Sequence, residues 1–309
     1  MGRAERIWIG LVAIALLVAG GAALLRTGTY GWTLFLLHPL VSGGLAAWMF
    51  RPRTAGRAAG VGALAVLATS GLALLFGWEG AVCIVMCLPI VMPAGAIGGL
   101  LVYGAERSTR ASRGLAMMLL LPPVSIPYDL YAPPPVFQVR SAIEVAAPPE
   151  QVWQRVLSFA ELPPPRELIF RAGVAYPTRT RLEGSGPGAV RYCEFSTGPF
   201  VEPIEIWDEP RLLAFRVAEN PAPMQEWSPF ANLVTRHLHG YLVSKRGQFQ
   251  LTALPNGRTL LVGTTWYQHG LWPAEYWRWW SDAIIHRIHL RVLEQIRVLA
   301  EADAPGGRK

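Results

Sequence analysis

Residues 136–157 read VFQVRSAIEVAAPPEQVWQRVL, and the pattern of this stretch changes half-way. Apolar and polar side chains alternate from Phe137 to Val145, which is typical of a half-buried strand. Pro148-Pro149-Glu150 then indicates the start of a helix. The apolar face of that helix consists of Val152, Trp153, Val156, Leu157 and Ala160. A domain that opens with a strand and a short amphipathic helix is therefore expected after the prolines 133–135.

The rest of the chain predicts antiparallel strands and one long helix. Strands are expected over residues 179–183, 190–196, 201–207, 212–217, 239–253 and 259–268, separated by Gly/Pro-containing turns. Asn256-Gly257 is the strongest of the hairpin signals. Residues 273–301 predict a C-terminal helix, because no glycine or proline follows its first turn. The order predicts an α+β domain over 136–309, with an antiparallel sheet around the long helix.

Two stretches resemble the SRPBCC, or START-like, superfamily. Residues 145–153 are similar to its I-x-A-P-x-x-x-V-W opening, and residues 188–192 and 205–217 are similar to its middle strands. The resemblance covers about 136–302 and is closest to the polyketide cyclase/dehydrase and lipid-transport branch. It implies a helix-grip fold with an apolar cavity between the sheet and the C-terminal helix. It implies no single activity and brings no shared catalytic residue.

The first 135 residues have a membrane-like composition. They hold 9 Lys/Arg and 4 Asp/Glu, against 19 and 17 in residues 136–309. Their uncharged windows cover 7–25, 30–50, 58–78 and 80–103, and each is long enough to cross a hydrocarbon core of about 30 Å as a helix. A shorter window, 114–128, contains three prolines and is either a fifth span or an interfacial segment. His38 is the one ionisable residue inside the four windows, so an anchor is expected rather than a transport path.

Arginine placement predicts the orientation of this anchor. The N-terminus, Arg51–Arg57 and Arg107–Arg113 are expected in the cytoplasm by the positive-inside rule. If 114–128 crosses the membrane, which we favour, the domain that follows lies outside the cytoplasm. If it does not cross, that domain is cytoplasmic. A multi-pass protein of a bacterial-type inner membrane is the expected localisation.

Several other classes of function are poorly supported. Of the net charge of +7, +5 falls in the membrane-like part and no basic stripe is present, which argues against nucleic acid as a partner. The three cysteines give no disulfide framework. The glycine loop 184–188 leads into a strand, so it predicts a hairpin turn and not a phosphate loop.

Asp282, His286 and His289 share one stripe of the predicted C-terminal helix and are the candidate catalytic residues. They form either an acid/base or metal group, or an Asp–His pair on a partly exposed flank, and the second alternative is favoured. A metal site made of His237, His239 and His269, or of Cys83 and Cys87, is not required by the spacing. No metal and no other cofactor is therefore expected.

The candidate ligand-binding residues lie on the apolar helix face and on the strands that oppose it. They are Trp277, Ile284, Ile288 and Val292 on the helix, with Tyr241 and Trp266 on the strands. The long loop 218–238 is expected to cover the cavity mouth. Arg191, Glu194 and Glu205 lie on predicted strands near the cavity, but a one-residue slip reverses the side that each faces. Trp279 is expected to point away from the core.

These features predict a membrane-anchored protein that binds a hydrophobic small molecule or lipid, with lipid transport or presentation as one use. The first alternative is a cyclase/dehydratase-like enzyme acting on a membrane-soluble substrate. The second is a partner-binding module that uses its tryptophan-rich surface. Neither the ligand nor a protein partner is identified by the sequence.

Overall fold

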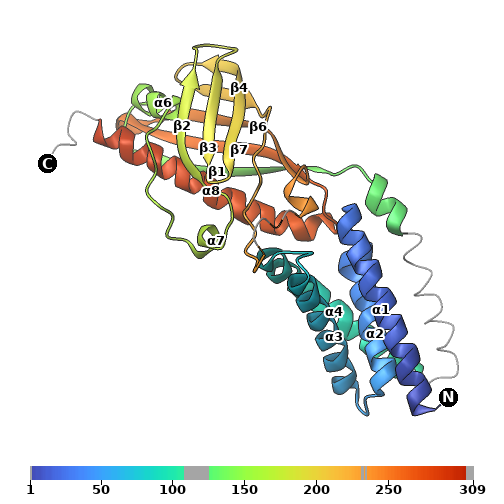
Figure 1. Ribbon diagram of the computed structural model, residues 1–309. Helices are drawn as coiled ribbons and strands as arrows, with labels where there is room; N and C mark the ends of the chain where they lie inside the picture. The colour runs from blue at the N-terminus through green and yellow to red at the C-terminus, as the bar shows by residue number, and fades with distance from the viewer. Residues whose placement is uncertain (1, 108–124, 231–232, 234, 304–309) are drawn as a thin grey trace. The chain divides into compact units, whose positions relative to one another are not determined.

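The computed structural model describes residues 2–107, 125–230, 233 and 235–303 (Figure 1). The chain divides into two compact units. The helical unit consists of Met1–Pro133, Glu226–His237 and Gly270–Pro273. The sheet unit consists of Pro134–Gln225, Leu238–His269 and Ala274–Lys309. Two segments from the second half of the chain therefore pack with the N-terminal helices.

Four long helices build the helical unit. They are α1 (Arg3–Thr27), α2 (His38–Phe50, continuous with the π-helical turn Thr33–Leu37), α3 (Ala55–Leu75) and α4 (Ala81–Ala105). All four are long and apolar enough to cross a membrane, which agrees with the four windows expected from the sequence. Most of the fifth window, 114–128, lies outside the described residues, and residues 125–131 are helical.

Glycine residues allow three of these helices to pack closely. A Cβ atom at Gly98 of α4 would lie 1.9 Å from the carbonyl oxygen of Leu40, and one at Gly99 would lie 2.2 Å from that of Ala58. A Cβ atom at Gly43 of α2 would lie 2.0 Å from the Gly95 carbonyl oxygen. Small residues of this kind let helix backbones approach one another. Helix α4 therefore packs between α2 and α3 through direct backbone contacts.

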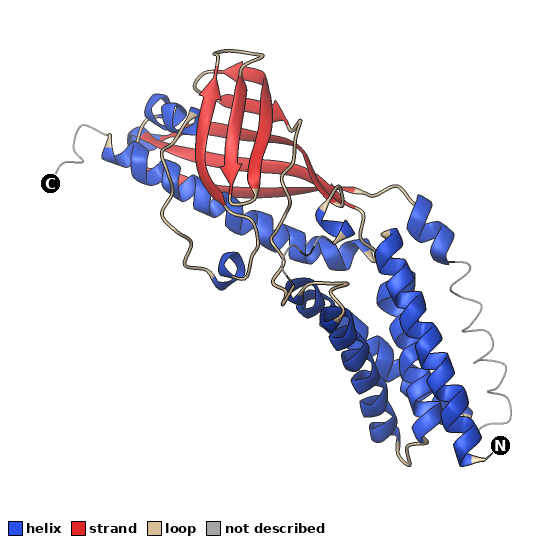
Figure 2. Ribbon diagram, in the orientation of Figure 1, coloured by secondary structure: helices blue, strands red, loops and turns tan. Residues whose placement is uncertain are grey.

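The sheet unit is built on seven antiparallel strands that form one curved sheet (Figure 2). The strands are β1 (Val136–Val145), β2 (Pro177–Glu183), β3 (Val190–Phe195), β4 (Gly198–Asp208), β5 (Leu212–Arg216), β6 (Leu242–Leu254) and β7 (Arg258–His269). Their spatial order is β1-β7-β6-β5-β4-β3-β2. The helices are α6 (Pro149–Leu157), α7 (Leu168–Arg171) and α8 (Ala274–Ala302). The predicted α+β class, with its antiparallel sheet and C-terminal helix, is confirmed.

The core of the sheet unit lies where α6 and α8 meet the sheet. Trp153 of α6 is fully buried and lies 5.7 Å, ring to ring, from Trp207 of β4. Leu293 and Ile296 of α8 are also fully buried and belong to the same cluster. A second cluster joins Phe137, Val139 and Tyr267 of the sheet to Ile285 of α8. The helix is thus held against the sheet by two apolar clusters along its length.

Replacing Gly98 by valine should disrupt the helical unit. The added side chain would collide with the backbone of α2, and overpacking of this kind costs about 1–3 kcal/mol or more. Gly104→Val is the matched control, because it lies on the same helix with nothing within 4 Å of the added Cβ. We expect Gly98→Val to lower the thermal unfolding midpoint of the detergent-purified chain clearly, and Gly104→Val to change it little. Equal midpoints for the two variants would contradict this packing.

Candidate functional site

A partly open cavity of about 130 Å³ lies in the sheet unit between strands β3–β7 and helix α8. Most of its lining is apolar, with Phe195, Phe200, Phe215, Phe249, Ile284 and Ile288 among the lining residues. An apolar cavity of about 150 Å³ in another protein holds one benzene molecule. The volume therefore fits a molecule of about one ring and is too small for a diacyl lipid.

A buried ion pair forms the polar wall of this cavity. Arg191 of β3 and Glu202 of β4 are register partners across the strand pair, and both are buried. Arg191 Nη1 donates to Glu202 Oε2, and the guanidinium lies 5.6 Å and 5.2 Å from the ring centres of Phe215 and Phe249. Nε and Nη2 of Arg191 donate to no nitrogen or oxygen atom, and the Cys193 sulfur is the other partner of the guanidinium. Two N–H donors of a buried guanidinium thus have no oxygen acceptor beside the cavity.

The protonation of this pair follows from burial and from mutual attraction. Burial raises the pKa of Glu202, and the charge and hydrogen bond of Arg191 oppose that rise. Burial alone would lower the pKa of Arg191, but the Glu202 carboxylate more than compensates, so the pKa is raised. We conclude that Arg191 stays charged beside Glu202.

His289 connects the cavity wall to the protein surface. Its Nε2 lies 2.8 Å from Thr265 Oγ1, and its Nδ1 lies 3.1 Å from Ser141 Oγ. Ser141 Oγ also lies 2.7 Å from Nδ1 of His286, which is exposed. Burial, together with the neighbouring His286, lowers the pKa of His289 to about 4. The ring is therefore neutral near pH 7, and both of its nitrogens are bonded to hydroxyl groups.

The expected pairing of Asp282 with a histidine is not what the structure shows. Asp282 Oδ1 accepts a hydrogen bond of 2.6 Å from the Tyr267 hydroxyl, and Oδ2 accepts one of 3.2 Å from Arg278 Nε. Burial and the bond to Asp282 raise the pKa of Tyr267. Asp282 binds these groups because β7 brings Tyr267 against α8 and Arg278 lies one helical turn before it. Of the three candidate catalytic residues, His286 and His289 come together and Asp282 does not join them.

Three of the six candidate ligand-binding residues line the cavity, namely Ile284, Ile288 and Val292. Trp277 is buried close to the start of α8 and is not part of the lining. Trp266 points to the other side of β7 from Thr265, because successive side chains of a strand alternate. Its ring lies 4.1 Å from the Arg246 guanidinium. Tyr241 precedes β6 and is also not part of the lining.

The loop 218–238 divides between the two units. Asn220, Pro221, Ala222 and Pro223 line the cavity. The Asn220 side chain is fixed by bonds of 2.8 Å and 3.2 Å to the backbone N–H and carbonyl of Ser244. Glu226–His237 belongs to the helical unit. Among the described residues of this loop, those at its start contact the cavity and can cover it.

The three histidines that were considered for a metal site lie in different elements. Residues Arg236–Leu238 form a 3-10 turn, and β6 begins at Leu242, so the strand expected from residue 239 begins three residues later and His239 precedes it. His239 is exposed. His269 lies in the sheet unit, where its ring stacks 5.2 Å from that of Phe137. His237 belongs to the helical unit.

Sequence reasoning identified Arg191 as a cavity candidate and missed Glu202. Of the three charged residues expected near the cavity, Arg191 faces it, whereas Glu194 pairs with Arg179 at 2.7 Å and Glu205 is exposed. Glu202 could have been found because it lies on the strand that forms a hairpin with the strand of Arg191. Opposite charges often pair across such strands. On α8, Trp279 is 63% exposed and Trp277 only 4%, as the helix geometry predicted.

No protein-family model and no curated protein matches the chain. Among solved structures, it is similar to the Zhui aromatase/cyclase from Streptomyces sp. R1128, with 19% identity, a TM-score of 0.33, and coverage of 56% of this chain and 100% of the other. It is similar to norcoclaurine synthase from Thalictrum flavum in complex with dopamine and hydroxybenzaldehyde, with 14% identity, a TM-score of 0.36, and coverage of 55% and 90%. It is also similar to the protein XoxI from Bacillus cereus, with 16% identity, a TM-score of 0.34, and coverage of 52% and 93%.

The lowered pKa of His289 predicts a loss of stability in acid. The folded state keeps this ring neutral down to about pH 4, whereas the unfolded chain protonates it below its ordinary value of 6.5. Between these values the unfolded chain binds more protons, so the free energy of unfolding falls as the pH falls. Above pH 6.5, His289 does not change the free energy of unfolding with pH. The full shift in the pKa of His289 corresponds to a loss of roughly 3 kcal/mol in the free energy of unfolding.

Thermal unfolding of the parent and of His289→Asn between pH 7 and pH 4 measures this contribution. The fall in the unfolding midpoint should be clearly smaller in His289→Asn. His239→Asn, which changes an exposed histidine, should follow the parent. Parallel curves for the parent and His289→Asn would show that His289 is not held neutral by burial.

Proposed function

We propose that the sheet unit binds one small, mainly apolar and neutral molecule in the cavity beside α8. The observation that supports this most strongly is an apolar cavity of about 130 Å³ that adjoins a buried arginine with two N–H donors that have no oxygen acceptor. Apolar burial supplies about 25 cal/mol per Å², and a few polar groups orient the ligand. The volume favours a compact small molecule over a lipid.

The polar wall limits the chemistry of the ligand. Arg191 and Glu202 cancel each other's charge, and His289 is neutral near pH 7, so the buried groups favour a ligand without net charge. Nε and Nη2 of Arg191, which have no oxygen acceptor, favour a ligand that carries a hydrogen-bond acceptor. A single ring with a carbonyl or hydroxyl oxygen meets both requirements.

Binding without catalysis is favoured by the contacts of His289. A general base needs a ring nitrogen within hydrogen-bond reach of its substrate. Both nitrogens of His289 are already bonded, to Thr265 and to Ser141. The contacts of the imidazole are therefore structural, because they hold β1 and β7 against α8.

The second candidate function is a cyclase/dehydratase-like enzyme that acts on a membrane-soluble substrate. The specific observation in its favour is the chain of groups that leads from Thr265, in the cavity lining, through His289 and Ser141 to the exposed His286. Such a chain can pass a proton between a substrate and solvent. His286→Ala separates the two functions, because it should leave ligand binding nearly unchanged and abolish turnover only if the chain is used.

We propose further that the four apolar helices anchor the protein in a membrane and that the sheet unit lies outside the cytoplasm. Arg6 and Arg51 both pair with Glu106, which marks one end of the helical unit. Asp129 accepts from the backbone N–H groups of Trp32 and Thr33 at the opposite end of α2. The described residues on the two sides of 108–124 therefore contact opposite ends of α2. This placement supports a fifth crossing after the arginine-rich end, which the positive-inside rule assigns to the cytoplasm.

Filling the cavity should block ligand binding. Ile288→Trp adds a large side chain to the cavity wall, whereas Leu290→Trp adds the same group at an exposed site on α8. Binding of 4-fluoroacetophenone, a single ring with a carbonyl acceptor, is measured by fluorine NMR on the full chain in an amphiphilic polymer. We expect binding to be lost in Ile288→Trp and kept in Leu290→Trp. Undiminished binding in Ile288→Trp would place the ligand elsewhere.

The proposed orientation predicts the activity of a compartment-specific reporter. Alkaline phosphatase, which is active only outside the cytoplasm, should be active when fused after Lys309 and inactive when fused after Arg107. A reporter for cytoplasmic location should give the reverse pattern. Cytoplasmic location of both fusion points would rule out the fifth crossing.

A further inference from the structure

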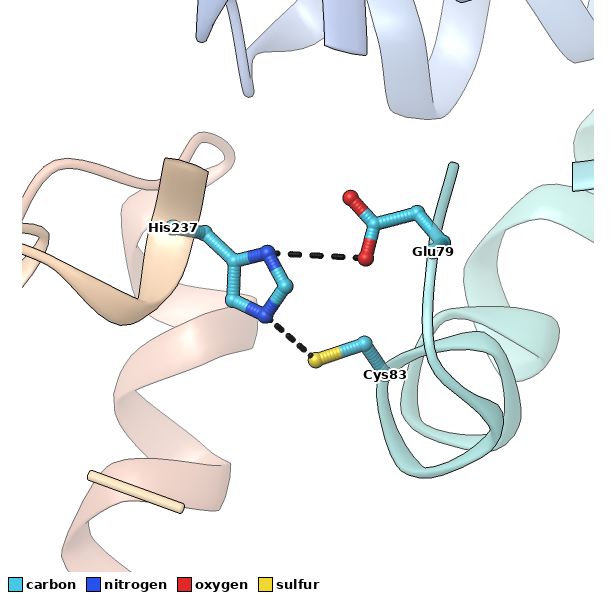
Figure 3. Close-up of side chains that lie close together, drawn as sticks. All are labelled: Glu79, Cys83 and His237. Carbon is cyan, nitrogen blue, oxygen red and sulfur yellow. Dashed lines mark hydrogen bonds and ion pairs between the residues drawn. The ribbon is translucent and has the colours of Figure 1, made fainter. Parts of the chain in front are cut away.

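A second polar cluster lies in the helical unit, apart from the cavity. Figure 3 shows Glu79, from the connection between α3 and α4, with Cys83 of the first turns of α4 and His237 of the 3-10 turn Arg236–Leu238. Cys83 Sγ lies 2.9 Å from His237 Nε2. His237 Nδ1 lies 3.5 Å from Glu79 Oε2, and Nε2 lies 3.6 Å from Oε1 of Glu226. Cys83 and Glu226 therefore lie beside Nε2 of His237, and Glu79 lies beside Nδ1 of the same ring.

The two carboxylates are arranged in the same way. Each uses one oxygen for a bond to the protein: Glu79 Oε1 accepts from the Tyr30 hydroxyl at 2.6 Å, and Glu226 Oε2 accepts from the backbone N–H of Val82 at 3.3 Å. The second oxygen of each is turned toward His237 at 3.5 Å and 3.6 Å, which is longer than an ordinary hydrogen bond. The Glu79 side chain is 9% exposed and that of Glu226 is 0% exposed. Buried carboxylate oxygens without a bond are costly, so this arrangement requires a counterpart.

We propose that Glu79, Cys83, Glu226 and His237 bind one divalent transition-metal ion of the Zn²⁺ class. Thiolate, imidazole and carboxylate are the groups that bind zinc in proteins, and four ligands complete its usual tetrahedral shell. The metal-binding atoms of Glu79, Cys83 and His237 lie within 4.8 Å of one another. Ligand atoms of a tetrahedral zinc site lie roughly 3.4–3.6 Å apart. His237 can bind one ion through only one ring nitrogen, and Glu226 Oε1 already lies 3.6 Å from Nε2. An ion bound at Nε2 therefore requires Cys83 Sγ to move from 2.9 Å to about 3.5 Å. It also requires the Glu79 carboxylate, now 3.5 Å from Nδ1, to turn toward the ion.

The donor set also selects the kind of metal. Mg²⁺ and Ca²⁺ prefer shells made of oxygen atoms, whereas a sulfur and an imidazole nitrogen together favour zinc and its neighbours among the transition metals. The ion's positive charge would offset the two buried carboxylates. The site would join residues 79–83 to the segment 226–237, which are about 150 residues apart in the chain.

A proton is the competing occupant of the cluster. Burial alone would lower the pKa of His237, but hydrogen bonds and the charges of Glu226 and Glu79 raise it to about 9. A protonated His237 between the two carboxylates would then satisfy part of the cluster without a metal. This alternative leaves the Cys83 thiol with no role in binding an ion, which makes Cys83 the residue to change.

The test uses the full chain purified in detergent, with Cys87→Ser as the matched control for Cys83→Ser. Cys87 lies one turn further along α4, and its Sγ bonds the Ile84 carbonyl oxygen instead of the cluster. After removal of metal with a chelator, one equivalent of Zn²⁺ is titrated and the bound metal is counted by mass spectrometry. The parent and Cys87→Ser should bind about one ion per chain, and Cys83→Ser and His237→Gln should bind it roughly 100-fold more weakly.

Co²⁺ supplies a reporter that does not depend on any activity. Bound through Cys83, it should give a thiolate-to-cobalt charge-transfer band in the parent and in Cys87→Ser, and none in Cys83→Ser. Circular dichroism confirms that each variant is folded. Binding of less than about 0.1 Zn²⁺ per chain by the parent, or an unchanged charge-transfer band in Cys83→Ser, would overturn the proposal in favour of the protonated histidine. Neither result bears on ligand binding in the sheet unit.

Discussion

A straight helix cannot contact a curved sheet along its whole length, and this constraint shapes the sheet unit. Helix α8 has 29 residues and is held by two apolar clusters, one around Leu293 and Ile296 and one around Ile285. Ile284, Ile288 and Val292 lie beside or within these clusters and face a space that the sheet does not fill. The space between the straight helix and the curved sheet is apolar for the same reason. Its walls are the apolar stripe of α8 and the inner face of the sheet, which are both made of residues suited to burial.

The Arg191–Glu202 pair is better explained by a role in ligand binding than by a contribution to the stability of the fold. Replacing a buried ion pair by apolar residues is often neutral or stabilising. A buried N–H donor without an oxygen acceptor costs about 1–3 kcal/mol, and Arg191 has two of them. A ligand oxygen that accepts from these donors would recover this cost only when bound. The pair therefore gives the ligand a preferred orientation inside an otherwise apolar wall.

The sequence was sufficient for the elements and insufficient for most contacts between them. The boundaries of β1 and α8 and the start of α6 followed from side-chain periodicity and from prolines, which act locally. Helix α6 ends at Leu157, before Ala160, which the periodicity had placed on its apolar face. The partner of Arg191 did not, because Val201-Glu202-Pro203 gives no alternation from which to infer the side that Glu202 faces. Asp282 was assigned to a histidine because helix spacing brings them close, while the bond to Tyr267 depends on how β7 packs against α8.

The cluster around His237 shows the same limit more strongly. Cys83 and His237 are 154 residues apart, and no pattern within either segment points to the other. The sequence placed His237 in the loop 218–238, and it did not show that this end of the loop forms a 3-10 turn beside the start of α4. Periodicity reports which face of an element is buried, and it does not report which distant segment covers that face.

The central claim is that the cavity recognises a neutral ring through apolar burial and through an acceptor that meets Arg191. The most direct measurement compares 4-fluoroacetophenone with 1-ethyl-4-fluorobenzene, which has nearly the same shape and lacks the carbonyl oxygen. With the full-length parent protein, the ketone should bind about 10-fold more tightly or better, since a hydrogen bond to a charged group contributes about 1.5–3 kcal/mol. In Arg191→Met the preference should disappear. Equal affinities for the two compounds in the parent, or an undiminished preference in Arg191→Met, would contradict the account.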